Sequence, residues 1–258
     1  MSSSYNALQV SVDKRFASGY SINSAFTWAK AMDHELGGFG WGDQSINPYD
    51  ANSSWGISTY NRAAVWTLSH LWEVPYGKGH KRGSNANGVV NAILGGWMFT
   101  GVTTVESGFP ISPNSSRQDN LNGEFGQRPD VVAGVGRYDV PGGQSRNHWY
   151  SPAAFNTSFS CCRWGNAGRS SMRGPGMASA DWAFWKEFKF KTPLNREETK
   201  IQFRWENYNL FNRTNMGMPD NTVDSSTAGR ITQLAGAGSG FGIIGPMRRM
   251  QFGLRLAW

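Results

Sequence analysis

The sequence predicts an all-β protein, an antiparallel transmembrane β-barrel with about seven long strands and long outer loops. Three observations predict this fold. Seven segments alternate apolar with polar or small residues, the pattern of a strand whose two faces have unlike surroundings. Each segment has about 10 to 13 residues, close to the ~9 to 11 that a tilted strand needs to cross the hydrocarbon core. The connections between the segments alternate between short and long.

The seven predicted strands are residues 5–16, 20–32, 64–74, 96–107, 181–190, 200–210 and 248–258. The last one alternates most clearly, and its less apolar face carries Arg249 and Arg255. Two unpaired arginines are too costly for a dry core but suit a water-filled lumen. Trp185 and Lys186 interrupt the alternation of the fifth segment, which leaves its exact register open but still predicts a strand.

The connections support the same fold. Residues 17–19 and 191–199 are short, whereas 33–63, 108–180 and 211–247 are long and 75–95 is intermediate. Outer-membrane barrels keep short turns on the periplasmic side and long loops outside. If the last strand ends in the periplasm, every long connection lies outside. The shortest connection, Ala17-Ser18-Gly19, is expected to be a tight hairpin turn.

Composition agrees with a barrel and excludes other classes. The chain has 32 glycines, 14% aromatic and only 17% charged residues, which suits glycine-rich loops and aromatic girdles. No apolar run approaches the ~18 residues of a transmembrane helix. A carbohydrate-binding β-sandwich is the alternative, although its strands are usually ~5 or 6 residues long.

Charge does not indicate a nucleic-acid partner. The net charge is +7, but the basic residues are scattered. The densest group, Lys78, His80, Lys81 and Arg82, lies in a glycine-rich stretch rather than along a helix or a stacking sheet. We expect a solvated turn there and no binding of nucleic acid.

No residue pattern predicts an enzyme, a metal site or a cofactor. Cys161 and Cys162 are too few for a zinc site, and a vicinal disulfide and two thiols both stay open. His70 is expected at a membrane interface rather than on a metal, because no second ligand is near in the sequence. Four acidic residues of one outer loop are expected to be solvated rather than to bind calcium: Asp33, Glu35, Asp43 and Asp50. Residues 235–240 are glycine-rich, but no Gly-Lys-Ser/Thr follows, so a flexible outer loop is expected instead of a phosphate site.

Two sets of side chains are candidates for contacts with partners. Aromatic residues of the outer loops either stack against a flat ligand such as a sugar or pack the loops together: Trp41, Tyr49, Trp55, Trp149 and Trp164. Alternate residues of the last strand end in an aromatic: Phe252, Leu254, Leu256 and Trp258. This series resembles the signal that the barrel-assembly machinery reads, and it also fits a lipid-facing strand.

Short motifs along nearly the whole chain carry a family resemblance. They are YNALQ (5–9), KRF (14–16), FTWAK (26–30), EVPYGKG (73–79), GGW (95–97), SGFP (107–110), RPDVV (128–132), GNAGR (165–169), RGPG (173–176) and FRWENYNLFN (203–212). In this order they resemble the C-terminal barrel region of Oar-like TonB-dependent outer-membrane receptors, the type that contains a carboxypeptidase-regulatory-like domain. The resemblance implies a plug, a TonB-contacting box and often a leading β-sandwich, none of which is seen in residues 1–258. Barrels of this class have even strand numbers, so residues 1–258 are expected to be the C-terminal part of one larger barrel domain.

The function implied by this resemblance is uptake of a nutrient across the bacterial outer membrane. The expected partners are outer-membrane lipid, the barrel-assembly machinery and a small-molecule, sugar or peptide ligand. The TonB complex is expected to act only through the missing N-terminal region. A surface adhesion or carbohydrate-binding module, anchored by the barrel, is the alternative function.

Overall fold

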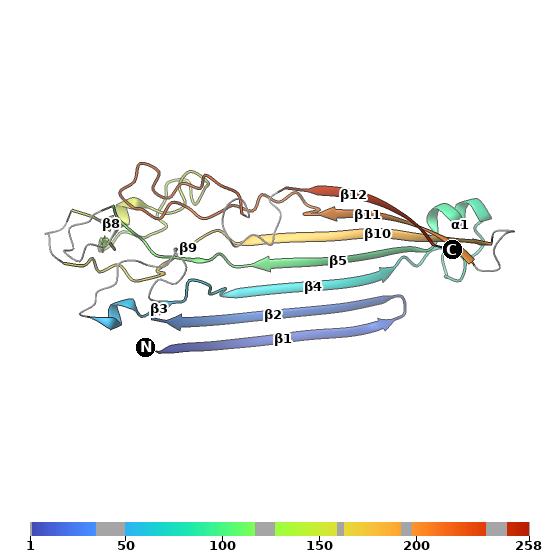
Figure 1. The fold of residues 1–258 in the computed structure, drawn as a ribbon, viewed down its shortest axis with the longest axis horizontal. Coiled ribbons are helices and arrows are strands. Elements are labelled where there is room, and N and C mark those ends of the chain that lie inside the picture. Colours follow the sequence, from blue (N-terminus) through green and yellow to red (C-terminus); the bar gives the residue numbers. More distant parts are fainter. Residues whose placement is uncertain are drawn as a thin grey trace.

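The computed structural model describes residues 2–34, 50–116, 127–158, 163–191, 198–235 and 247–257. Most of it is one antiparallel sheet (Figure 1). Its long strands are β1 (Ser3–Ala17), β2 (Tyr20–Asp33), β4 (Ala64–Glu73), β5 (Trp97–Glu106), β10 (Met177–Lys191), β11 (Glu198–Tyr208) and β12 (Arg249–Ala257). All seven strands predicted from the alternation are therefore present, and the predicted fold class is confirmed.

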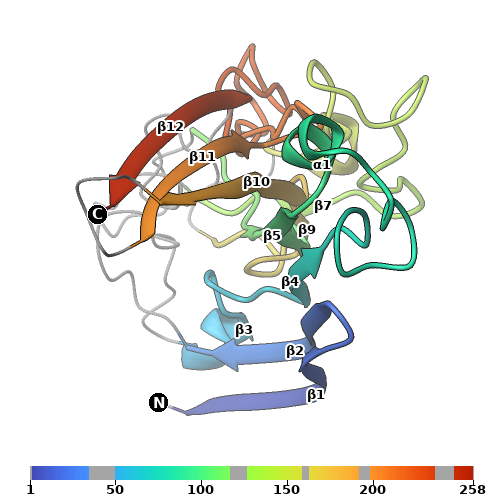
Figure 2. The same ribbon diagram turned by 90° about the vertical axis from the view of Figure 1, so that its right-hand side faces the viewer.

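The long strands follow one another in the sheet as they do in the sequence, in the order β1-β2-β4-β5-β10-β11-β12. Every pairing along this path is antiparallel. Seen along the strands, the sheet curves strongly, as the wall of a barrel does (Figure 2). β1 and β12 are its two edges, and the sheet is open between them.

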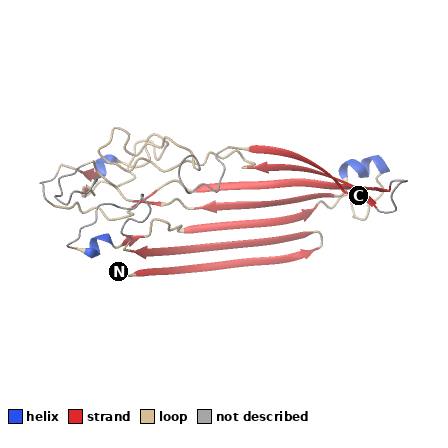
Figure 3. Cartoon of the chain, viewed as in Figure 1, coloured by secondary structure: helices blue, strands red, loops and turns tan. Residues whose placement is uncertain are grey.

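Short elements lie in the connections (Figure 3). The β2–β4 connection holds η1 (Ala51–Ser54) and β3 (Gly56–Ile57), which adds to the end of β2. The β5–β10 connection holds β6 (Pro110–Ile111), β7 (Asp130–Val131), η2 (Pro152–Ala154), β8 (Phe155–Asn156) and β9 (Met172–Arg173). The β4–β5 connection holds α1 (Gly88–Leu94), where the sequence had indicated only a turn. None of the helices in the described ranges is long and apolar enough to cross a membrane.

The β1–β2 hairpin confirms the turn expected at residues 17–19. Ala17 pairs with Tyr20, and the two residues between them have positive φ, 56° for Ser18 and 83° for Gly19. Positive φ at both central positions is the type I′ geometry, whose twist matches that of the flanking strands. Glycine adopts it without a steric cost.

Long connections gather at one end of the sheet, together with the N-terminus (Figure 1). The β1–β2 hairpin, α1 and the C-terminus lie at the opposite end. This is the arrangement expected from the connection lengths. We call the two ends the outer end and the inner end.

The register separates the residues of each long strand into two faces. One face is apolar, and a row of aromatic rings crosses it from β5 to β12. Along this row Phe99 stacks on Phe184 at 4.7 Å, Phe184 on Trp205 at 5.7 Å and Trp205 on Phe252 at 6.1 Å between ring centroids. Such ring pairs contribute ~0.5–1.5 kcal/mol each beyond their buried area.

The apolar side chains at the sheet edges are open to the surroundings. Leu254 is 75% exposed and Phe252 is 67% exposed. The opposite face holds polar and charged side chains, among them Asp13, Arg204 and Arg255. Each face therefore needs a different medium, lipid on one side and water on the other.

The position of α1 shows which face is outermost. Figure 2 shows α1 outside the curve of the sheet. The ammonium group of Lys186 on β10 donates hydrogen bonds to backbone carbonyls of this segment, at 2.7 Å to Ala92 O. Lys186 pairs with Phe203 and Trp97, so it shares their apolar face. The apolar face is therefore the convex one, and the polar face lines the inside of the curve.

The register at Trp185 and Lys186, which the alternation left open, is regular. Both residues keep the regular pairing with β11 and β5. The pattern is interrupted because Lys186 occupies an apolar-face position, where it is covered by α1.

Candidate functional site

The long connections at the outer end are folded together into one packed structure. We call it the outer cap and define it as residues 50–63, 107–116, 127–158, 163–176 and 209–235. It has its own apolar core, made of Ile111, Tyr150, Ala154, Phe155, Ala167, Met172 and Val223. Because these residues come from both the β5–β10 and β11–β12 connections, the core holds the two connections together.

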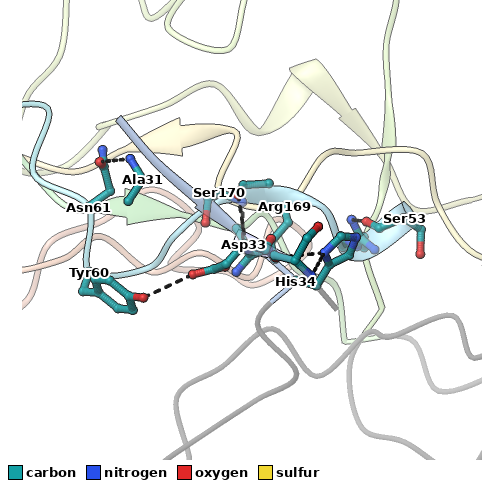
Figure 4. A network of polar contacts seen from close by, with 12 residues as sticks. Ala31, Asp33, His34, Ser53, Tyr60, Asn61, Arg169 and Ser170 are labelled. Carbon is teal, nitrogen blue, oxygen red and sulfur yellow. Dashed lines mark hydrogen bonds and ion pairs between the residues drawn. The ribbon is translucent and has the colours of Figure 1, made fainter. Parts of the chain in front are cut away.

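An ion pair joins the outer cap to the end of β2 (Figure 4). The guanidinium of Arg169 contacts the carboxylate of Asp33 and also donates to Gly56 O at 3.1 Å. The Arg169 side chain is only 1% exposed. A buried charge needs such a set of partners, because an unpaired one is strongly destabilising.

Gly56 permits this arrangement. A Cβ atom at this position would lie 3.0 Å from Arg169 O and 3.1 Å from Arg169 Cβ. A larger residue would push the arginine away from its carbonyl partner. Tyr60 adds a weak contact from the same connection, with Oη 3.4 Å from Asp33 Oδ2.

A second buried arginine, Arg128, joins the β2–β4 and β5–β10 connections. Its Nη1 donates to Ser53 O at 2.9 Å and to Ala167 O at 3.3 Å. Ser53 belongs to η1, which begins after Asp50, and the Asp50 carboxylate accepts a hydrogen bond from Asn52 N at 3.0 Å.

These contacts correct the expectation of a solvated acidic loop. Asp33 is the partner of a buried arginine, and Asp50 caps the N-terminus of η1. Glu35 and Asp43 lie outside the described residues. The acidic residues that are described therefore have structural partners inside the protein.

Asp220 is the polar centre of the β11–β12 part of the outer cap. Its carboxylate accepts hydrogen bonds from Thr227 Oγ1 and from Thr222 N, and its carbonyl accepts one from Tyr150 Oη at 2.8 Å. Burial acts to raise the pKa of Asp220, but these bonds from threonines, and one from Ser225, outweigh it and lower the pKa. Burial raises the pKa of the Tyr150 phenol well above its ordinary value, so this hydroxyl stays a donor.

Asp130 forms a further ion pair, with Arg163, nearer the surface. The hydrogen bond from Arg163 lowers the pKa of Asp130, and Asn166 N adds a hydrogen bond at 3.0 Å. The Asn166 side chain in turn accepts from Val131 N at 2.8 Å. The carboxylate thus orders the segment around β7.

Three of the predicted loop aromatics lie in the described part of the outer cap. Trp55, Trp149 and Trp164 are half-buried in the outer cap. Trp149 donates from Nε1 to Arg173 O at 2.8 Å, and Trp55 packs on the ring of His34 at 4.7 Å. Their packing role is therefore visible, and a role in ligand contact stays a prediction.

Other predicted residues cannot be placed in this way. Trp41, Tyr49, Cys161, Cys162, Trp258 and residues 236–240 lie outside the described residues. The outer cap also has exposed aromatic side chains that were not among the predicted loop aromatics. Tyr60 and Tyr138 stand on the surface of the outer cap.

His70 lies within the sheet rather than in the outer cap. Its ring packs against Phe99 at 4.6 Å and Trp182 at 5.5 Å. Across the described ranges, no group of three or more metal-binding side chains is found. The described neighbours of the His70 ring are aromatic, as expected for a residue of the apolar face.

A shallow hollow of about 500 Å³ lies along the sheet between β1 and β5. Its lining includes polar-face residues such as Asp13, Asn23, Ser69 and Thr100. Asn23 donates a hydrogen bond to Asp13 at 3.2 Å. The hollow is part of the polar inner wall, so the inside of the curve offers hydrogen-bonding groups along its length.

The comparisons with known proteins agree with this arrangement. The family model described as "Outer membrane beta barrel domain" matches residues 1–251. No curated protein and no solved structure matches the chain. An apolar convex face, a polar concave face and long connections gathered at one end are typical of such a domain in a membrane. The chain belongs to the outer membrane beta barrel domain family and is a protein of the bacterial outer membrane.

Proposed function

We propose that this chain is the barrel part of a TonB-dependent transporter that takes up a nutrient across the outer membrane. The observation that supports it is the folded outer cap. Three connections from different parts of the sequence are held together by Arg128, Arg169 and the Tyr150 core. A packed surface of this kind presents fixed groups to a ligand, whereas flexible loops would lose conformational entropy on binding. The motifs shared with Oar-like receptors favour the same function.

We further propose that residues 1–258 form the C-terminal part of a larger barrel. The six successive antiparallel pairings make β1 and β12 run in the same direction. Antiparallel closure requires edge strands that run in opposite directions. An odd number of additional strands between them would satisfy this requirement and produce an even total, as in bacterial barrels.

Uptake by cells tests the transport proposal. Cells that produce the full-length protein are incubated with a panel of isotope-labelled sugars and peptides, with and without a protonophore. We expect one ligand class to accumulate inside, and the protonophore to abolish that accumulation because TonB-dependent transport uses the inner-membrane proton gradient. Label that binds to the cell surface but is insensitive to the protonophore would contradict transport.

Surface adhesion or carbohydrate binding is the second candidate function. Exposed Tyr60 and Tyr138 on the outer cap favour it, because aromatic rings stack on sugar faces. Protonophore-insensitive surface binding in the same assay is the result expected of this function. Neither proposal assigns a catalytic role to the chain.

A further inference from the structure

The β4–β5 connection at the inner end contains α1 and a basic turn. α1 contacts the apolar face of the sheet through hydrogen bonds to its backbone carbonyls. Lys186 Nζ donates to Asn91 O at 3.2 Å, to Ala92 O at 2.7 Å and also to Gly95 O. Trp97 Nε1 donates to Ile93 O at 2.8 Å. The contact is thus made by the C-terminal carbonyls of the helix.

These contacts stabilise the charge of Lys186, which lies on the apolar face of β10. An ammonium group on the convex face would meet lipid, where an isolated charge is costly. The carbonyl groups at a helix C-terminus carry partial negative charge and offer free acceptors. With α1 in place, Lys186 is only 4% exposed.

The outward side of α1 is apolar. Val89 is 68% exposed, Ile93 60% and Leu94 51%. No residue of this seven-residue helix is buried. These side chains therefore form an exposed apolar surface on α1, beside the convex face of the sheet and over the charge that α1 covers.

The turn before α1 is basic, in contrast to the apolar side of the helix. Lys78, Lys81 and Arg82 are exposed, and no ion pair to any of them occurs within the described ranges. The turn is nevertheless ordered, because Gly77 N donates to Arg82 O at 2.8 Å. It also binds to the helix, since Lys78 N donates to Asn91 Oδ1 at 2.8 Å.

We infer that residues 76–95 form an interfacial anchor that binds the anionic phospholipid of the adjacent leaflet. The apolar residues of α1 enter the acyl-chain boundary, and the basic turn contacts headgroup phosphates. Two observations favour lipid over another occupant: the exposed apolar side chains of α1 lie beside the lipid-facing side of the sheet, and three exposed cations lie in the adjoining turn. Such a pairing of apolar and basic residues is typical of interfacial segments. The inference rests on the family assignment and does not depend on transport.

Local quenching of a fluorophore tests the inference in the full chain. Cys161 and Cys162 are changed to serine, and Ser84→Cys in the turn is labelled with the fluorophore NBD. The protein is folded into phosphatidylcholine vesicles that contain a small, equal fraction of spin-labelled phosphatidylglycerol or phosphatidylcholine. We expect phosphatidylglycerol to be preferred at least about fivefold, the contribution of one basic residue near a membrane surface. The triple variant K78Q/K81Q/R82Q should bring the ratio close to one.

A charge-matched control separates a local site from a general effect of charge. The variant R213Q/R230Q/R248Q removes three exposed arginines from the outer end, and it should leave the ratio unchanged. In the unsubstituted turn, raising the salt concentration to about 0.5 M should reduce the preference, because salt screens exposed charges. This measurement needs no substitution in the turn, so it tests the inference even if the triple variant folds poorly.

Four results would overturn the inference. The first is equal quenching by both lipids in a protein that shows the heat-modifiable gel shift of an inserted barrel. The second is an equal loss of preference in the control variant. Competition by millimolar inorganic phosphate would indicate a site for free phosphate, and NBD self-quenching would indicate a second copy of the chain on α1. A protein that fails to insert into any vesicle would contradict the barrel assignment itself.

Discussion

Arginine at position 254 should destabilise the barrel strongly, whereas arginine at the adjacent position 253 should be tolerated. Leu254 lies near the middle of β12 on the apolar convex face and is 75% exposed. An arginine on the lipid face costs ~2–4 kcal/mol near the bilayer midplane. At about 1.4 kcal/mol for each factor of ten, this lowers the folding equilibrium constant roughly 30- to 700-fold.

Gly253 is the matched position because it has nearly the same depth and points inward. Its φ lies outside the left-handed region, and a Cβ there would meet only Arg204 Cβ, at 3.8 Å. Arg204 is its partner across the strands, and like charges in such a pair cost ~0.2–1 kcal/mol. The neighbouring Glu206 contacts Arg204 at 2.6 Å and offsets part of this cost. The lipid-face substitution should therefore be worse by at least ~1 kcal/mol.

Urea titration of both variants in lipid vesicles measures this difference. The folded fraction is read from the heat-modifiable gel shift, and the difference between the midpoints, multiplied by the slope m, gives the difference in unfolding free energy. A third variant, Gln251→Arg, places the new charge opposite Glu206 on the polar face and should be close to neutral. If Gly253→Arg is as destabilising as Leu254→Arg, the assignment of the two faces is wrong.

Three further predictions concern the outer cap and the orientation of the chain. Arg169→Ala removes the buried guanidinium that joins Asp33 to Gly56 O, so the outer cap should lose roughly 3 kcal/mol of local stability, measured by hydrogen exchange; wild-type protection would contradict this. Single cysteines at Gln144 and Ser84, both exposed, should be labelled in intact cells only at 144, and labelling at 84 alone would invert the orientation. Because its ion pair with Arg163 holds the folded pKa of Asp130 below the unfolded value of ~3.9, the stabilisation is present above that pH and is lost as the pH falls through the lower folded pKa. Asp130→Asn should remove this acid-dependent loss of hydrogen-exchange protection, and a loss unchanged in the variant would contradict the assignment.

The structure also limits which positions can report on topology. Ser115 belongs to the long outer connection and would be chosen from the sequence as a labelling site. It is fully buried, and its backbone pairs with Gln127 in an isolated bridge. Burial of a small polar residue inside a connection leaves no periodic signal in the sequence. The choice of a labelling site in such a connection therefore needs the tertiary structure.

The sequence by itself determined the strands, their order of connection and the β1–β2 turn. These features depend on local rules: side chains alternate along a strand, a strand of fixed length crosses a membrane, and Ser18-Gly19 adopts positive φ. The same rules could not predict α1, because residues 88–94 are a short segment next to Gly95 and Gly96, and the carbonyls of the helix contact Lys186, which is distant in the sequence.

Only the tertiary structure decided which connections meet in the outer cap. Asp33 and Arg169 are 136 positions apart in the sequence, and neither lies in a pattern that marks the other. Their pairing depends on where the end of β2 lies relative to the β5–β10 connection, which follows from the curvature of the whole sheet (Figure 2). Local periodicity specifies the wall of the barrel, whereas the outer cap is specified by contacts between connections that become neighbours only after the strands have paired.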